Sequence, residues 1–146
     1  MKPHPIFHLP IKLYFEDTDA LGIVYHANYL KYFERARTEW FRAAGLNHME
    51  LASQTGVGFV IRKCTMDWLS PLTLDDEIIA TAQVTKMGNA SVALLQTIVK
   101  NGKVVCSATI LMVCVDFQTK KPQVIPDVVR RIFETPTNAP AMNMNG

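Results

Sequence analysis

Hydrophobic residues recur at helical spacing in one stretch of the chain, from about residue 27 to residue 44. Asn28 is the expected N-cap of this helix, and Gly45 is the residue expected to end it. The apolar positions form one broad face, made of Tyr29, Phe33, Ala36, Trp40, Ala43 and Ala44. A face of that width predicts a long helix that packs against a large surface.

Five other stretches are rich in Val, Ile, Thr and aromatic residues, which is typical of strands. They cover residues 11–15, 59–69, 77–86, 90–100 and 103–117. Asn101-Gly102 favours a two-residue hairpin turn, and Met87-Gly88-Asn89 favours a second tight connection. Tight turns join antiparallel neighbours, so we expect an antiparallel sheet of about five strands against the long helix. Shorter helices are expected at residues 48–54 and 125–133.

The chain of 146 residues has the length of one domain. We interpret residues 1–133 as that domain, with residues 1–10, which contain three prolines, as an extended lead-in to the first strand. Residues 134–146 contain too few apolar side chains to pack and are expected to form a disordered tail.

The last strand predicts a partner subunit. Residues 108–115 are apolar at nearly every position, which indicates that both faces of the strand are covered. One long helix covers only one face of a sheet. The chain is also 49% hydrophobic and only 19% charged, which is apolar for a soluble protein. We therefore expect a homo-oligomer that is at least a dimer.

Composition argues against several classes of function. The net charge is +2 and the basic residues are scattered, so no nucleic-acid surface is expected. The longest apolar run, residues 108–115, is shorter than the ~20 residues of a membrane span. Cys64, Cys106 and Cys114 lack Cys-x-x-Cys spacing and lie in apolar runs. We interpret them as buried thiols in a reducing compartment, the cytoplasm, and predict no metal site and no cofactor.

A polar stretch between the first strand and the long helix carries the candidate chemistry. Glu16, Asp17 and Asp19 supply three carboxylates where a turn needs only one. Gly22 follows, and the pair Tyr25-His26 then precedes the helix.

Together with Asn28-Tyr29 and residues 34–39, the order and spacing of this stretch resemble a known enzyme family. The chain is similar to hotdog-fold acyl-CoA thioesterases of the 4-hydroxybenzoyl-CoA thioesterase family, and most like the bacterial branch associated with the Tol-Pal envelope system. The similarity extends from about Pro10 to Phe133. It implies an α+β hotdog fold, in which the antiparallel sheet wraps around the long helix, hydrolysis of an acyl-CoA, and assembly as a dimer or a dimer of dimers.

Thioester hydrolysis requires a carboxylate that attacks the carbonyl carbon or activates a water, and donors for the oxygen that becomes negative. The first backbone N–H groups of a helix are such donors. If the loop folds back at Gly22, the Asp19 carboxylate and the free amides near residues 25–27 can face one bound carbonyl. By motif position, the resemblance implies that Asp19 is the catalytic aspartate and that the amide of His26, or of its neighbour, polarises the carbonyl.

Each of these residues also has a structural interpretation. His26 stands where the founding member of the family has a tyrosine, and its imidazole either assists proton transfer or packs in the wall of the site. Asp19 can serve as an Asx-turn or capping residue. We interpret Asp17 as a structural acceptor, and Glu34 as part of a local ion pair with a basic neighbour on its helix.

Lys86, Lys120 and Lys121 are the candidates for binding the phosphates of coenzyme A. They lie roughly where the family gathers basic groups, although the founding member's basic run at the first turn is replaced here by residues 88–90. Lysines at strand ends also occur as solvated edges. The identity of the acyl group stays open, as does the choice between coenzyme A and an acyl carrier protein.

Two alternatives to hydrolysis remain open. A hotdog dehydratase acting on a hydroxyacyl thioester would use His26 and Glu34 as base and acid, and would leave Asp19 idle. A non-catalytic acyl-thioester-binding scaffold subunit would keep the fold and use its surface to engage an envelope complex.

Overall fold

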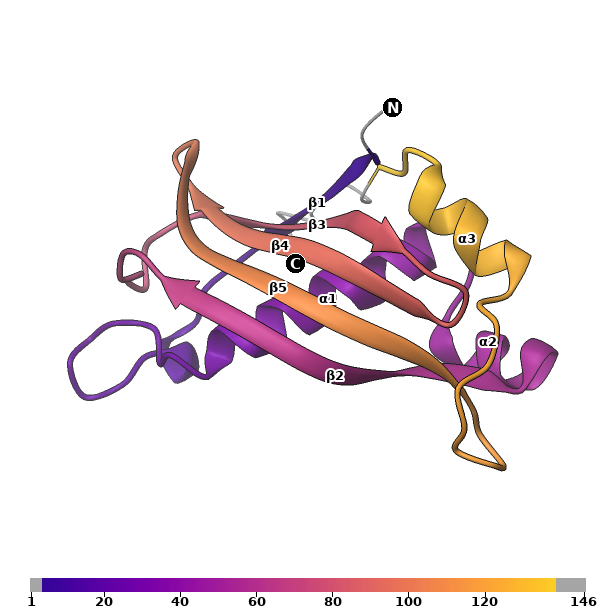
Figure 1. Ribbon diagram of the computed structural model, residues 1–146. Coiled ribbons are helices and arrows are strands. Elements are labelled where there is room, and N and C mark those ends of the chain that lie inside the picture. Colours follow the sequence, from indigo (N-terminus) through magenta and orange to yellow (C-terminus); the bar gives the residue numbers. More distant parts are fainter. Residues whose placement is uncertain (1–3, 139–146) are drawn as a thin grey trace.

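A five-stranded antiparallel sheet curves around one long helix in the computed structural model, which describes residues 4–138 (Figure 1). The strands are β1 (Ile6–Ile11), β2 (Val57–Trp68), β3 (Ile78–Met87), β4 (Ser91–Lys100) and β5 (Lys103–Asp116). The helices are the 3-10 turn η1 (Phe15–Asp17), α1 (Asn28–Ala43), α2 (His48–Thr55) and α3 (Asp127–Glu134). The strand order is β1-β3-β4-β5-β2, and every neighbouring pair is antiparallel. The α+β class and the antiparallel sheet predicted from the sequence are confirmed.

The turn between β4 and β5 shows how local chemistry produces this topology. Asn101 and Gly102 both have positive φ, 51° and 75°, as a type I′ turn requires. Lys100 and Lys103 pair on either side of the turn. The β3–β4 connection is equally tight, with a backbone hydrogen bond of 2.7 Å across it. Both hairpins predicted from the sequence are therefore present.

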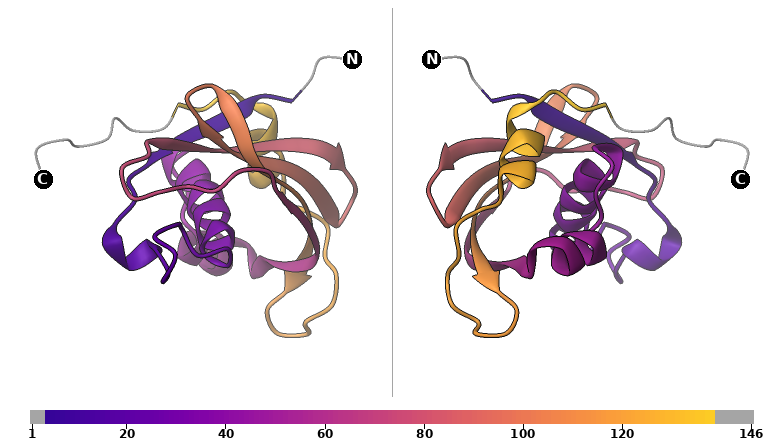
Figure 2. Two further views of the ribbon diagram at one scale, coloured as in Figure 1. Left: turned by 90° about the vertical axis from the view of Figure 1, so that its left-hand side faces the viewer. Right: turned by 90° about the vertical axis from the view of Figure 1, so that its right-hand side faces the viewer.

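Helix α1 lies in the concave face of the sheet and packs mainly against β1, β3 and β4 (Figure 2). Its buried side chains are Tyr29, Tyr32, Phe33, Ala36, Trp40 and Phe41. Trp40 stacks on Phe7 of β1 with 5.9 Å between ring centroids, and meets Phe133 of α3 edge to face at 5.3 Å. These contacts join the helix, the sheet and the C-terminal helix into one core. Gly45 follows the last turn of α1 with a φ of 89°, as predicted for the residue that stops it.

The first strand lies earlier in the chain than the sequence predicted. β1 occupies Ile6–Ile11 in place of residues 11–15, and Phe15 begins the 3-10 turn η1. The prolines of residues 1–10 had indicated a lead-in without strand structure. Pro10 is tolerated because β1 is an edge strand that, in the part of the chain that the structure describes, pairs only with β3, so a residue without an N–H can occupy its free side.

The opposite edge of the sheet is open. Within residues 4–138, β2 pairs only with β5, and its middle is exposed on both faces: Val60 and Ile61 are each 49% exposed. On β5, alternate residues between 108 and 115 are buried, whereas Leu111 and Val113 are only half-buried. A single chain therefore does not cover both faces of β5. The expected homo-oligomer stays a prediction.

Three further expectations concern thiols, membrane spans and the tail. Cys106 and Cys114 are buried as predicted, but Cys64 is exposed because it lies on the open strand β2. None of the helices within residues 4–138 is both long and apolar enough to cross a bilayer. The predicted tail begins inside α3, because Glu134 is the last residue of that helix, and residues 139–146 lie outside the described residues.

Candidate active site

Residues 18–27, which we call the Asp19 loop, connect η1 to α1 and fold back on themselves. The Asp19 amide donates to the Ile23 carbonyl at 2.9 Å, and the Gly22 amide donates to the Asp19 carbonyl at 3.0 Å. Gly22 has a φ of 77°, a left-handed conformation that favours glycine. Thr18 and Val24 form an isolated bridge below the turn. The loop therefore reverses at Gly22, as the sequence analysis required.

Contacts with two other segments hold the Asp19 loop at one end of the sheet. The Val24 amide donates to the Leu72 carbonyl at 2.8 Å, and Ile23 forms a bridge with Thr73. The indole N–H of Trp68, the last residue of β2, donates to the His26 carbonyl at 3.1 Å. The loop is thus connected to β2 and to the segment that follows it.

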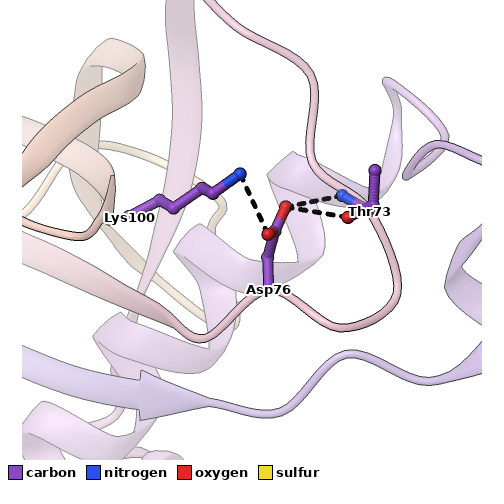
Figure 3. Close-up of polar contacts among 3 residues, drawn as sticks. All are labelled: Thr73, Asp76 and Lys100. Carbon is purple, nitrogen blue, oxygen red and sulfur yellow. Dashed lines mark hydrogen bonds and ion pairs between the residues drawn. The ribbon is translucent and has the colours of Figure 1, made fainter.

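The segment that carries Thr73 is itself held by a polar cluster (Figure 3). One carboxylate oxygen of Asp76 accepts from the backbone N–H of Thr73 at 2.7 Å and from its hydroxyl at 3.2 Å. The other oxygen pairs with the ammonium of Lys100 at 2.9 Å. Burial opposes ionisation of Asp76, but the donors from Thr73 and Lys100 outweigh it and hold the pKa of this carboxyl below its ordinary value. Sequence analysis did not single out this cluster, because Lys100 is far from Thr73 and Asp76 in the chain.

Asp17, directly before the Asp19 loop, is hydrogen-bonded to both ends of the segment that contains the loop. Its side chain is buried, and one carboxylate oxygen accepts from the Tyr14 amide at 2.7 Å. Its carbonyl accepts from the Tyr25 amide and from the side-chain N–H of Asn28, each at 2.9 Å. These contacts favour a structural role for Asp17. They also correct the predicted cap: Ala27 precedes α1, and the side chain of Asn28 is directed to Asp17 and does not cap the helix.

Asp19 is only partly buried. One of its carboxylate oxygens accepts from the Leu21 amide at 2.9 Å, which is the Asx turn considered in the sequence analysis. The other oxygen accepts no hydrogen bond from residues 4–138. Asp19 therefore shapes the turn and still presents one oxygen that a substrate or a water can reach.

The backbone amides of His26 and Ala27 donate to no acceptor within residues 4–138, and they lie directly before α1. The Tyr25 amide is not free, because it donates to Asp17, so the expected set of three amides is reduced to two. The His26 ring is exposed and lies between aromatic neighbours, 4.5 Å from Tyr25 and 6.1 Å from Trp68 by ring centroids. The start of α1 thus presents two unpaired donors with the partial positive charge of a helix N-terminus.

A cavity of about 520 Å³ lies farther along α1, from the middle of the helix toward its C-terminus, between that helix, α2 and the first residues of β2. Its apolar wall includes Phe41, Leu51, Phe59, Ile61, Met112 and Phe117. Its polar wall is made of Glu34, Arg37, Thr38 and His48. We call it the Arg37 cavity. Because α1 and β2 run antiparallel, the cavity and the Asp19 loop lie at opposite ends of both elements in one chain.

The three candidate lysines lie at the cavity end of the sheet. Lys86 is exposed near the end of β3, and Lys120 and Lys121 are exposed in the turn after β5. The Lys120 ammonium lies 5.6 Å above the ring of Phe117, which forms part of the cavity wall. A single chain therefore does not bring the lysines to Asp19.

Glu34 does not form the expected ion pair. Among the residues that the structure describes, its carboxylate lies within ion-pair distance of no basic group, and it lines the Arg37 cavity instead. No hydrogen bond joins His26 and Glu34 within residues 4–138, because His26 lies before the start of α1 and Glu34 lies beside the cavity. The same residues hold no cluster of three or more potential metal ligands.

Comparisons with known proteins point to one family. Residues 13–133 match the model of the thioesterase-like superfamily. The acyl-CoA thioesterase YbgC of Haemophilus influenzae is 35% identical over 127 residues, which are 87% of this chain and 93% of that protein. The acyl-CoA thioester hydrolase YbgC of Escherichia coli O157:H7 is 38% identical over 130 residues, 88% of this chain and 96% of that protein.

Solved structures share the fold. A hypothetical protein from Aquifex aeolicus superimposes with a TM-score of 0.80 at 26% identity, covering 87% of this chain and 98% of that chain. A 1,4-dihydroxy-2-naphthoyl-CoA thioesterase from Synechocystis superimposes with a TM-score of 0.81 at 18% identity, covering 88% and 95%. The hotdog fold predicted from the sequence is confirmed.

Proposed function

The chain belongs to the thioesterase-like superfamily, and from this premise we propose that it hydrolyses an acyl-CoA to a free acid and coenzyme A. The observation that carries the proposal is the match, over nearly the full length of both chains, to relatives named acyl-CoA thioesterase or acyl-CoA thioester hydrolase. Acyl-CoA substrates and unpaired cysteines both fit a reducing compartment, so the cytoplasm is the proposed location.

Asp19 is the proposed catalytic carboxylate. In one route its free oxygen attacks the acyl carbon, the C–S bond breaks, and a water then hydrolyses the acyl-aspartyl anhydride. In the other route the carboxylate takes a proton from a water whose oxygen adds to the carbon, and that proton passes to the departing sulfur. Both routes consume one water and release the acid and the thiol. The accessible oxygen of Asp19 supports either.

The amides of His26 and Ala27 are the proposed donors to the carbonyl oxygen. They are unpaired within residues 4–138 and lie at the N-terminus of α1, where the helix dipole favours negative charge. The fold-back at Gly22 places Asp19 in the same loop as these donors. The exposed His26 ring contacts Tyr25 and Trp68, which suits a wall of the site.

We propose that the working form is a homodimer, alone or within a dimer of dimers, in which the β2 edges of two copies pair. β2 is the longer of the two free edges, whereas β1 is short and contains Pro10, a common protection against pairing. An antiparallel pairing along the whole of β2 would set Trp68 of one copy opposite Val57 of the other. The Asp19 loop of one copy would then face the Arg37 cavity of its partner.

This arrangement gives the lysines a role that a single chain does not. Lys86, Lys120 and Lys121 of one copy would lie at the end of the sheet where the partner's Asp19 loop arrives, and are proposed to bind the phosphates of coenzyme A. Sedimentation at micromolar concentration is expected to show a dimer or a larger assembly, and a stable monomer would contradict the proposal.

Subunit mixing tests the shared site directly. Asp19→Asn removes the carboxylate, and Gly58→Leu blocks the cavity, because even a Cβ at Gly58 would lie 2.7 Å from the Phe117 ring. Each variant alone should be inactive. Hybrid dimers would contain one intact site, so a mixture of the two variants should recover activity. No recovery after verified subunit exchange would place both parts of the site in one chain.

The reaction is tested with a panel of acyl-CoA and 3-hydroxyacyl-CoA substrates, in which free thiol and enoyl product are measured separately. Thiol release by the wild type, lost in Asp19→Asn, is the expected result. Enoyl product without thiol release would support the dehydratase alternative. Binding of acyl-CoA without either product would support the scaffold alternative.

A further inference from the structure

Arg37 introduces a charge into a cavity whose walls are largely apolar. It is partly buried on α1, and its guanidinium donates one hydrogen bond, from Nη1 to the Gln96 side-chain oxygen at 2.8 Å. This is the only hydrogen bond that the Arg37 side chain makes within residues 4–138, and no carboxylate there lies within ion-pair distance of it. The other N–H groups of the guanidinium donate to no acceptor within residues 4–138.

Gln96 fixes the position of that guanidinium. Its side chain on β4 is fully buried, and its amide nitrogen donates to the Phe33 carbonyl at 3.1 Å and to the Thr81 carbonyl at 3.2 Å. With both donors used, its oxygen is left to accept from Arg37. A buried amide with every partner satisfied has one preferred orientation, so Gln96 holds the Arg37 guanidinium in one position beside the cavity.

The other polar groups of the cavity do not neutralise Arg37 by direct contact. Glu34 lies one turn before it on α1, is exposed, and is not paired with it. Burial lowers the pKa of His48, and the nearby Arg37 and Arg42 lower it further, so His48 is uncharged at neutral pH. Burial likewise lowers the pKa of Arg37, yet an arginine stays charged at neutral pH. A cation in this setting is stabilised by any anion that reaches it.

We infer that Arg37 binds a carboxylate at the far end of the acyl group, so that the preferred substrates are ω-carboxyacyl-CoA thioesters. The inference rests on the proposed hydrolase function and names the substrate class of that site. The apolar wall accepts the methylene chain, and the planar guanidinium offers a carboxylate two parallel donors. A cavity of about 520 Å³ has the size of an ordinary small-molecule site.

Matched substrate pairs provide the test. Adipoyl-CoA and hexanoyl-CoA have the same chain length and differ only in the terminal carboxylate, as do suberoyl-CoA and octanoyl-CoA. The wild type is expected to favour the carboxylated member of the better pair by roughly ten- to a hundredfold in kcat/KM, the range of a charge-assisted hydrogen bond. Arg37→Met should abolish or invert this ratio, and Arg37→Lys should reduce it.

Arg42→Met is the matched control, because Arg42 lies on the same helix, is exposed, and is outside the cavity wall. It should leave the ratio as in the wild type. A purely structural Arg37 would lower kcat/KM for both members of a pair equally, together with the melting temperature. A wild-type preference for the uncharged member at every length would overturn the inference even if Arg37→Met failed to fold.

Binding of thioether analogues separates this inference from the hydrolase proposal. S-hexyl-CoA and S-(5-carboxypentyl)-CoA cannot be hydrolysed and share the coenzyme A part, so the difference between their affinities, measured by calorimetry, reports on the terminal carboxylate. Tighter binding of the carboxylated analogue, lost in Arg37→Met, would support the inference even if no thioester were turned over, and the hydrolase proposal alone would fail. Equal affinities in the wild type, or no binding of either analogue, would overturn the inference.

Discussion

The Asp19 loop and the Arg37 cavity lie at opposite ends of α1 and β2, and they are built in opposite ways. In the loop, backbone groups close in sequence bind one another: the Gly22 amide reaches Asp19, and the Tyr25 amide reaches Asp17. In the cavity, side chains from α1, α2, β2 and β5 meet across the fold. Hydrogen bonds fix the loop and leave one Asp19 oxygen and two backbone amides without partners within residues 4–138. Side-chain packing forms the walls of the cavity and leaves an empty volume between them.

The difference suggests how chemistry and specificity are divided. The loop places one carboxylate and two amides against a thioester that is the same in every acyl-CoA. The cavity would meet the acyl group, which differs from one substrate to another. Variants of the loop should therefore change the rate for all substrates, and variants that change the chemistry of the cavity wall without blocking the cavity should change the ratio between substrates.

Asp19→Asn should have the largest effect on the loop side of this comparison. The amide keeps the size of the side chain and can still accept from Leu21, but it neither attacks a carbonyl nor takes a proton from water. We expect kcat to fall on the order of 10²–10⁴-fold for every acyl-CoA, in a steady-state thiol-release assay.

Asp17→Asn is the matched control for that experiment. Because Asp17 is buried and its carboxylate accepts from the Tyr14 amide, its loss should lower the melting temperature, with any loss of activity following the loss of folded protein. If Asp17→Asn were inactive but well folded while Asp19→Asn remained active, the catalytic role would belong to Asp17.

The contrast between loop and cavity also explains what could be predicted from the sequence. The hairpin turn at Asn101-Gly102 and the end of α1 at Gly45 follow from local conformational preferences, and the chain reversal at Gly22 belongs to a contiguous motif. The predicted position of β1 was wrong because the prolines before residue 11 argued against a strand. Prolines are compatible with an edge strand, but whether a strand lies at the edge depends on the whole sheet. Arg37 and Gln96 were not recognised as partners, because their contact joins positions that no periodicity connects.

Ala27→Pro should have the second largest effect. Ala27 has a φ of −73°, which proline can adopt, so the substitution removes one unpaired N–H. Proline also restricts the backbone of His26, the residue before it, so the melting temperature of the variant is measured beside its activity. Losing one donor to the carbonyl oxygen is expected to lower kcat by about 10²–10³-fold. His26→Ala, which keeps both amides, should stay within about tenfold of the wild type, since only the ring is lost. Near-normal activity of a folded Ala27→Pro variant would leave the His26 amide as the remaining candidate.

The lysines provide a smaller effect of a different kind. Replacing Lys86, Lys120 or Lys121 with alanine should raise KM for acyl-CoA several-fold and change kcat less, which is the signature of lost uniform binding. Lys103→Ala, in the hairpin at the other end of β4 and β5, is the control. The effect should weaken at high salt, because exposed charges are screened. Unchanged KM at low salt for all three variants would remove the lysines from the site.

Asp76→Asn should have the smallest effect on activity and should reveal how the Asp19 loop is supported. Asp76 holds Thr73, and Thr73 is bridged to Ile23 in the loop (Figure 3). The pKa of Asp76 is lowered in the folded chain, so its carboxylate stabilises the fold above the unfolded pKa of about 3.9, and this contribution is lost as the pH falls through the folded value.

At neutral pH the Asp76→Asn variant should lose about 1–2 kcal/mol of stability and a few-fold in kcat for all acyl-CoA substrates alike, because the loop and not the cavity is loosened. In thermal unfolding followed by circular dichroism, the difference in melting temperature between the variant and the wild type should begin to shrink below about pH 4, the unfolded pKa, and should disappear as the pH falls through the lower pKa of the folded carboxyl. The exposed neighbour Asp75 provides the control Asp75→Asn, which should show neither effect. A stability difference that persisted undiminished at low pH would mean that the ionised form of Asp76 does not support the segment that carries Thr73.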